Sequence, residues 1–291
     1  MEILTNYTFQ IVALGSVLLA VAAAPVGAFS VYKGQSLIGD AIGHSTFPGI
    51  ILAYMAFATR SPVILLAGAI LAGAASYALI QLAHRDKRLG LDANLAIFLS
   101  GFFGLGMALK SFIQGNPDYA GASQAGLGTY IFGQAAYMLE ADVLLIAVVS
   151  ALVLTLLLLF YKELKLFVFD AEYAEVVGLP CRLLNLLLLV MTIAVIGIGI
   201  KAVGAILISS FLIIPCVAAN QWSNNFARVL LLSSLIGAVS ALVGTYISTL
   251  EQGMSTGPSI ILVASLIAFF SIVFGTKGIL GSVLKRRHAH G

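Results

Sequence analysis

Charged residues, cysteines and a nucleotide-binding loop are scarce or lacking in this sequence. Only 9% of its 291 residues are charged, whereas about a quarter are charged in an average soluble domain. The two cysteines, Cys181 and Cys216, have no paired spacing, so neither a disulfide framework nor a CxxC metal site is supported. No segment matches GxxxxGK[ST], the phosphate-binding loop of many ATPases. These absences exclude an ordinary soluble domain and ATP hydrolysis by a P-loop in this chain.

Apolar residues dominate instead, at 60% of the chain with a mean hydropathy of +1.07. Apolar runs of about 20 residues recur from end to end, and each is long enough as a helix to cross a hydrocarbon core of roughly 30 Å. The alternating apolar and polar residues of a membrane barrel do not occur. Basic residues collect in a few loops and the net charge is only +3, so nucleic acid binding is not indicated. The sequence predicts an all-α, polytopic integral membrane bundle in a lipid bilayer.

The predicted bundle has eight or nine transmembrane helices in a single domain covering residues 1–291. The count is eight if the first run or the 201–219 run is incomplete or re-entrant. We expect the first run to be a retained helix with its N-terminus outside, because no basic leader precedes it. The basic cluster 84–88 and the basic tail 276–291 are predicted to be cytoplasmic. The apolar runs cover residues 7–31, 37–57, 63–82, 95–109, 142–161, 183–200, 201–219, 229–250 and 259–274.

Asp40 and His44 form the polar pair that most needs an explanation. An ionised aspartate at the centre of a bilayer costs ~2.5–3.5 kcal/mol, so it is expected to have a partner and to face protein or an aqueous path. In a helix, the i,i+4 spacing places both side chains on one face with their Cβ atoms roughly 5–6 Å apart. The pair could therefore hold one cation. The alternative is that Asp40 lies near a water-accessible helix end and simply hydrogen-bonds His44.

An Asp/His couple supplies only two ligands, whereas a stable divalent site needs about four to six. A second copy of the chain would remove this shortfall. In a homodimer with the helix near the two-fold axis, two carboxylates and two imidazoles would meet around one ion. The sequence thus predicts half of a metal site in each chain.

The segment 162–182 is the longest polar interruption in the second half of the chain, and its charges predict a cytoplasmic position. Residues 170–177 can form a two-turn amphipathic helix, with Asp170 and Glu172 near its N-terminus and a Gly-Leu-Pro stretch at its end. We expect Phe167, Phe169 and Tyr173 to be exposed beside it. Exposed aromatic side chains on a cytoplasmic surface indicate a binding partner.

Other candidate residues are weaker. His288 and His290 belong to the basic tail, where weak chelation and a disordered tail are both open, and His84 lies in a basic loop. Glu140 and Asp142 could attract cations at the outer surface, with solvation at the interface as the simpler explanation. Residues 114–128 are predicted to form an outward loop, followed by a short interfacial helix over residues 130–138.

Four stretches together resemble the membrane subunits of the zinc/manganese/iron branch of bacterial ABC importers. They span most of the chain in the expected order. They are SLIGDAIGHSTFPG at 36–49, KELKLFVFDAEYAEVVGLP at 162–180, VGAILISSFLIIP at 203–215 and, more weakly, GPSIIL at 257–262. Cys216, where alanine is expected, departs from the pattern, and a thiol there could respond to soft metals.

The resemblance implies a multi-pass permease of the bacterial plasma membrane that works as a homodimer. It implies two cytoplasmic ATPase subunits and an external solute-binding protein as partners. It assigns the transported manganese, zinc or iron ion to Asp40 and His44, with no resident cofactor and no catalytic residue, because the ATPase is separate. It also assigns ATPase coupling to the helix within segment 162–182. The residues that carry this coupling role are Phe169, Asp170, Glu172, Tyr173, Glu175 and Gly178.

Two alternatives remain open at this stage. A permease for a larger metal chelate, of the siderophore or cobalamin type, would need a wider pore and no metal ligands of its own. A channel or ion-coupled carrier would move metal without any ATPase. The Irving–Williams order adds that ligand affinity alone would favour zinc over manganese, so selection must come partly from the protein that delivers the ion.

Overall fold

The computed structural model describes residues 6–59, 61–84, 90–119, 138–250 and 254–280. Within these ranges every regular element is a helix, which confirms the predicted all-α polytopic bundle. The elements are α1 (Tyr7–Tyr32), α2 (Ile38–Phe57), α3 (Pro62–His84), α4 (Leu91–Gly115), the 3-10 turn η1 (Pro117–Tyr119), α6 (Glu140–Leu159), α7 (Tyr161–Phe169), α8 (Ala171–Val176), α9 (Cys181–Val203), α10 (Ala205–Asn220), α11 (Phe226–Leu250) and α12 (Thr256–Phe274).

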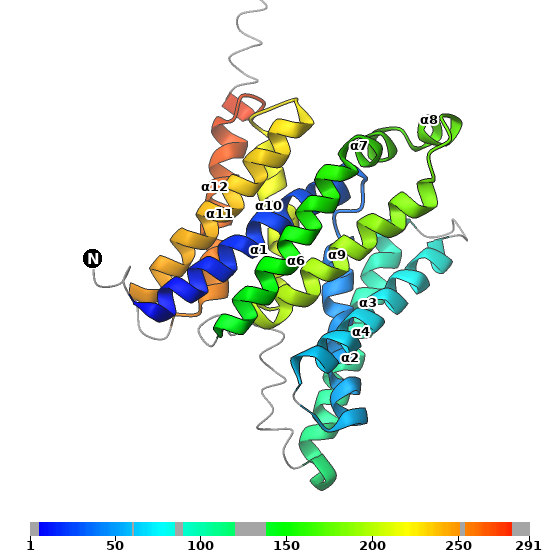
Figure 1. Cartoon of the computed structure of the whole chain (residues 1–291), viewed down its shortest axis with the longest axis vertical. Helices are drawn as coiled ribbons and strands as arrows, with labels where there is room; N and C mark the ends of the chain where they lie inside the picture. Colours follow the sequence, from blue (N-terminus) through cyan, green and yellow to red (C-terminus); the bar gives the residue numbers. More distant parts are fainter. Residues whose placement is uncertain (1–5, 60, 85–89, 120–137, 251–253, 281–291) are drawn as a thin grey trace, which may run out of the picture.

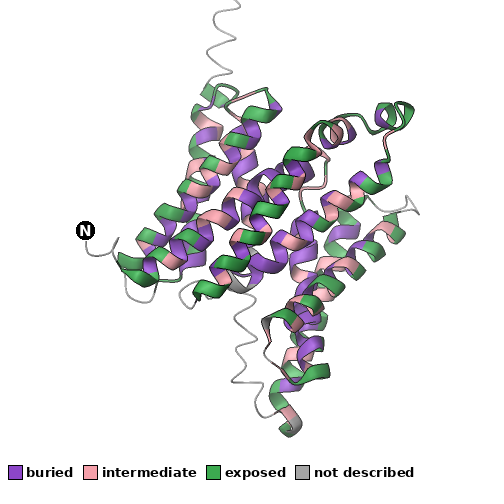
Figure 2. Ribbon diagram, viewed as in Figure 1, coloured by how far each residue is buried: buried purple, intermediate pink, exposed green. Residues whose placement is uncertain are grey.

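Seven of the described helices, α1, α3, α4, α6, α9, α11 and α12, are long and apolar enough to cross a membrane. Helix α10 is shorter, with 16 residues. Helix α2 has 20 residues, which corresponds to roughly 30 Å, but it contains the polar pair and a proline. Figure 2 shows exposed residues along the outward faces of the bundle, and large apolar side chains such as Leu71, Leu231 and Phe269 are among them. These faces suit contact with lipid.

Helix α1 lies in the middle of the bundle and is the most buried of the seven long helices. It packs against α6, α9, α10 and α11 (Figure 1). Its central alanines, Ala22, Ala23 and Ala24, are fully buried, and such small side chains allow neighbouring helices to approach closely. At Gly27 the approach is closest, because an added Cβ would lie 1.9 Å from the carbonyl oxygen of Leu212 in α10. The core is therefore built around α1.

Helices α2, α3 and α4 form a second group of neighbours beside this core (Figure 1). Gly49 of α2 and Gly68 of α3 face each other so closely that a Cβ on either would lie 2.2 and 2.4 Å, respectively, from the other's carbonyl oxygen. Ala53 and Ala72, one turn further along, complete two small-xxx-small pairs. Small residues thus fix the distance between α2 and α3, and with it the position of the polar pair.

We expect Gly49→Ala to lower the thermal unfolding midpoint of the purified protein in detergent. The new Cβ would overlap the backbone of α3, and overpacking of this kind costs ~1–3 kcal/mol, or roughly 2–10 °C in a chain of this size. Gly101→Ala on α4 is the matched control, because a Cβ there meets nothing within 4 Å. Equal midpoints for the two variants would contradict the close approach.

Two predicted boundaries differ from the structure. The run predicted to end at residue 200 continues as α9 to Val203, where Gly204 with a φ of +85° ends the helix before α10 begins. Glycine adopts this left-handed φ without a steric penalty, so the break falls there and not at Lys201. Helix α4 also runs from Leu91 to Gly115, beyond both ends of the predicted 95–109 run. The short helix predicted at 130–138 lies almost entirely outside the described residues, as do His288, His290 and most of the basic tail.

Candidate metal site and coupling surface

Asp40 and His44 lie one turn apart at the start of α2, and their side chains meet. Asp40 is in the first helical turn, and its Oδ1 is 3.4 Å from Nε2 of His44. The predicted i,i+4 placement on one helix face is therefore confirmed. The role of the pair as metal ligands stays a prediction. Their side chains are 31% and 16% exposed, respectively, so the pair is half-enclosed and keeps an open side.

Neighbouring helices hold both side chains. The Ser209 hydroxyl of α10 hydrogen-bonds to the carboxylate of Asp40. The ring of Phe103 in α4 packs edge-on against the imidazole of His44, with 5.1 Å between the ring centroids. Such outer contacts fix the orientation of potential ligands, as in known metal sites. The pair is thus positioned by α4 on one side and by α10 on the other.

The start of α2 lies inside the helical layer and not at its edge. Tyr32 and Asn220, at the ends of α1 and α10, are joined by a hydrogen bond of 2.9 Å between Oη and Oδ1. Gly39 packs against Leu212, eight residues before Asn220 and hence roughly 12 Å deeper along α10. Asp40 follows directly after Gly39. Asp40 therefore lies in the first turn of its own helix but deeper than the ends of α1 and α10.

In the part of one chain that the structure describes, this site brings together two potential ligands, Asp40 and His44. Within the described ranges, no group of three or more His, Cys, Asp or Glu side chains could hold a metal ion. Cys181 and Cys216 are both free and buried, and no disulfide joins them, in agreement with their lack of a paired spacing. At the far end of α1, Tyr7 donates a hydrogen bond to Glu140, so this carboxylate joins α1 to α6 there.

The predicted amphipathic helix is present as α8, preceded by α7. Asp170 is its N-cap and accepts a hydrogen bond of 2.9 Å from the backbone N–H of Tyr173. Gly178 has a φ of +87° and follows the C-cap residue Val177, so the helix ends at the predicted place. Figure 1 shows α8 at a tip of the molecule, away from the core.

The exposed side chains of this segment differ in part from the prediction. Phe169 and Tyr173 are exposed as predicted, but Phe167 is only 7% exposed. The prediction for Phe167 was wrong because α7 is itself a helix, whose inner face turns Phe167 toward the core beneath Lys33. Sequence reasoning also missed Val176, which is 83% exposed. The available signal for its exposure was that Val176 directly follows the acidic residue Glu175.

Phe169 connects this segment to the core. Its exposed edge faces outward, while its ring packs on Tyr32 of α1 and Phe226 of α11, with centroids 5.3 and 5.2 Å away. Tyr161, at the start of α7, stacks on Phe226 as well, and burial raises the pKa of its hydroxyl. Aromatic rings bury a large area and pack in specific geometries, so these contacts fix the position of α7 relative to α1 and α11.

Fold and site together define a multi-pass helical membrane protein with a carboxylate–imidazole pair inside its helical layer. The sequence matches the ABC 3 transport family over residues 5–275. It is 38% identical over 288 residues to the zinc transport system membrane protein TroC of Treponema pallidum, covering 99% of this chain and 96% of that one. It is 39% identical over 268 residues to the manganese transport system membrane protein MntC of Bacillus subtilis, covering 92% of this chain and 61% of that relative's length.

A solved structure, PsaBC from Streptococcus pneumoniae in complex with Fab, has the same fold. It matches with a TM-score of 0.81 and 27% identity, over 94% of this chain and 93% of that one. The chain therefore belongs to the ABC 3 transport family. The resemblance found in the four sequence stretches is confirmed.

Proposed function

We propose that this chain is the permease subunit of an ABC importer that moves a divalent transition metal, manganese, zinc or iron, into the cytoplasm. The observation that carries the proposal is the Asp40–His44 pair, in contact at 3.4 Å inside the helical layer. Carboxylate and neutral imidazole suit all three metals. Family membership and the zinc and manganese transport named for its relatives support the same cargo. The membrane would be the bacterial plasma membrane.

In this proposal the working unit is a homodimer. One chain supplies two ligands, and the part of it that the structure describes contains no cluster of three. Two copies related by a two-fold axis near α2 would supply two carboxylates and two imidazoles, which reaches the four ligands of a tetrahedral site. The open side of Asp40 is compatible with an ion held between two chains. The ion would be held only transiently.

The segment 162–182 would contact the ATPase. Its exposed tip offers both apolar and acidic groups, and two ATPase subunits would bind the two copies of this chain. An external solute-binding protein would deliver the metal on the opposite side. The contact residues would be Phe169, Asp170, Glu172, Tyr173, Glu175 and Gly178. Residues 1–291 would form one permease domain, with the basic tail 276–291 on the ATPase side.

Reconstitution tests this proposal. The chain is purified with the ATPase that co-purifies with it, placed in liposomes with the external binding protein, and assayed with radioactive Mn²⁺ and Zn²⁺. We expect uptake that requires ATP and the ATPase. Uptake by the chain alone would overturn the proposal in favour of a channel or carrier. Competition by metal chelates but not by free salts would overturn it in favour of a chelate permease.

A further inference from the structure

Lys33 occupies a junction between four elements of the fold. It begins the turn of residues 33–37 that joins α1 to α2. Its ammonium group donates a hydrogen bond to Oδ1 of Asn185 in α9 and lies 4.9 Å above the ring of Phe167 in α7. Asn185 in turn donates a hydrogen bond of 2.8 Å to the hydroxyl of Tyr77 in α3. One side chain thus links the turn into α2 with α7, α9 and α3.

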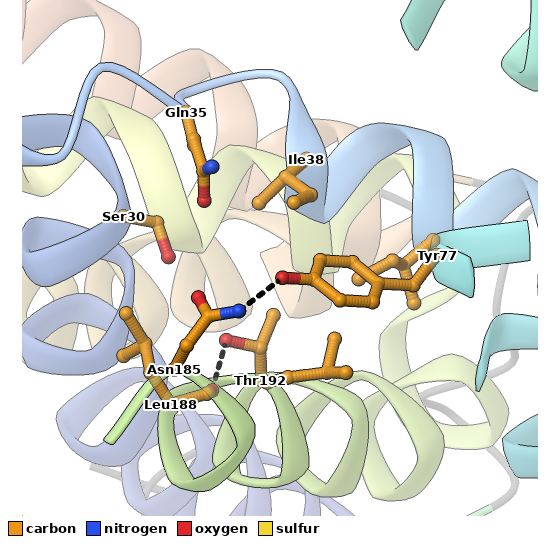
Figure 3. A pocket seen from close by; sticks show the side chains of 9 residues that line it. Ser30, Gln35, Ile38, Tyr77, Asn185, Leu188 and Thr192 are labelled. Carbon is orange, nitrogen blue, oxygen red and sulfur yellow. Dashed lines mark hydrogen bonds between the residues drawn. The ribbon is translucent and has the colours of Figure 1, made fainter. Parts of the chain in front are cut away.

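A small polar pocket lies directly beside this junction. Figure 3 shows the Asn185–Tyr77 hydrogen bond at its centre, with Ile38 of α2 pointing toward it. Residues two apart on a helix stand about 200° apart, so Asp40 projects from the other side of α2. The pocket therefore lies behind the helix that carries the metal pair.

Lys33 is poorly compensated at this junction. Burial lowers the pKa of its ammonium group to about 8, so it is still mostly charged at neutral pH. Its neighbours are an amide oxygen and an aromatic face, and among the described residues no carboxylate lies within ion-pair distance of it. A desolvated cation without a counter-ion favours any rearrangement that brings one closer.

Glu163 is a carboxylate in the right place for such a rearrangement. It lies on α7 one turn before Phe167, hence on the same side of that helix as the ring beneath Lys33. Its Oε2 atom is buried and has no hydrogen-bond partner in the described structure. Most buried polar atoms in native proteins are paired, so an exception asks for an explanation. Two opposite charges therefore lie near Phe167 without pairing.

We propose that Lys33 is a positioning residue that couples the ATPase-facing segment to the metal-bearing helix by exchanging Asn185 for Glu163 when α7 moves. The proposal rests on the proposed function, because it requires an ATPase that displaces α7 and α8. A coupling element needs two discrete arrangements with different contacts, and here these are Lys33 bonded to Asn185 and Lys33 paired with Glu163. The turn that begins with Lys33 has only five residues, 33–37, before α2 begins. A shift of Lys33 is therefore passed on to Asp40 and His44.

The test compares metal uptake with ATP hydrolysis in liposomes that contain the whole importer. We expect Lys33→Met and Glu163→Gln each to lower the number of metal ions moved per ATP by about tenfold or more, which is the size expected for one charge-assisted bond. ATP hydrolysis should stay within about twofold of wild type, because the docking tip is unchanged. The double variant should lose no more than either single variant, since both remove one interaction.

Two further variants separate this role from a structural one. Lys33→Arg keeps the cation and should retain most of the uptake per ATP. Arg228→Met removes an exposed cation at the start of α11 and should leave the ratio unchanged. A wild-type ratio in Lys33→Met, equal loss of uptake and hydrolysis, or additive losses in the double variant would overturn the coupling role while the proposed function stands. Absence of ATP-driven uptake by the wild-type importer would overturn both.

Discussion

Asp40→Ala should reduce ATP-driven uptake of manganese and zinc by at least about 100-fold. In the proposed homodimer, each substitution removes two ligands from the ion at once. Loss of an outer-shell contact alone typically costs ~10–100-fold in metal affinity, and loss of two direct ligands costs more. The measurement is radioactive Mn²⁺ or Zn²⁺ uptake by the reconstituted importer, with the amount of protein in the membrane verified for each variant.

His44→Ala should have an effect of the same size, because the imidazole is the second proposed ligand of the pair. Ser209→Ala is expected to be milder, ~10–100-fold, since Ser209 hydrogen-bonds to the Asp40 carboxylate and is not itself a proposed ligand. Ser45→Ala serves as the control on the same helix, because the buried hydroxyl of Ser45 hydrogen-bonds to Ser76 of α3 and to the backbone of Ala41. Undiminished uptake in both Asp40→Ala and His44→Ala would remove the metal role from these residues.

Val176→Asp should separate the chain from its ATPase. Val176 is the most exposed apolar side chain of α8, so a carboxylate there costs little in folding but would place a charge in the proposed contact. A carboxylate buried in an interface without a partner costs free energy of desolvation, and a loss of the size of an interface hot spot, ~2–4 kcal/mol, corresponds to roughly 30- to 1,000-fold in affinity. We expect co-purification of the ATPase and ATP-driven uptake to be lost together. Both are measured on the same preparation.

Charge reversal at the acidic positions gives an independent test of the same surface. Glu172→Lys combined with Glu175→Lys should weaken ATPase binding, most strongly at low salt, where exposed charges are least screened. Arg228→Glu reverses an exposed charge outside the segment and should leave binding intact. Full co-purification after both changes in α8 would argue that another part of the chain docks the ATPase.

Sequence reasoning located the features that depend on local patterns. The Asp40/His44 spacing needed only a helix to bring the side chains together, and α2 provides it. Asp170 was predicted near the N-terminus of the amphipathic helix and is found there as its N-cap. Gly178 was predicted at the helix end and has the positive φ of such a position, and both residue types have strong local preferences. Hydropathy alone was sufficient for the membrane class, because long apolar runs leave few alternatives.

Features set by tertiary packing could not be predicted in the same way. Between the predicted runs 183–200 and 201–219 the sequence placed the break at Lys201, whereas the structure has it at Gly204, because the break depends on the backbone angle there. The burial of Phe167 depends on how α7 folds back beneath Lys33. Lys33 itself gave no signal as a single basic residue after an apolar run, which usually indicates only a membrane boundary.

Each copy in the proposed dimer would supply only Asp40 and His44 as ligands, and this limits how tightly cargo can be held. In the proposed dimer, the distance between two α2 helices sets the coordination number of the ion. A separation of a few ångströms would change a four-ligand site into two incomplete ones, because metal–ligand distances tolerate little variation. Separation of the two α2 helices would then open the path of the ion and lower the affinity of the site for the metal at the same time. A permease built in this way needs no separate device to release a tightly bound ion.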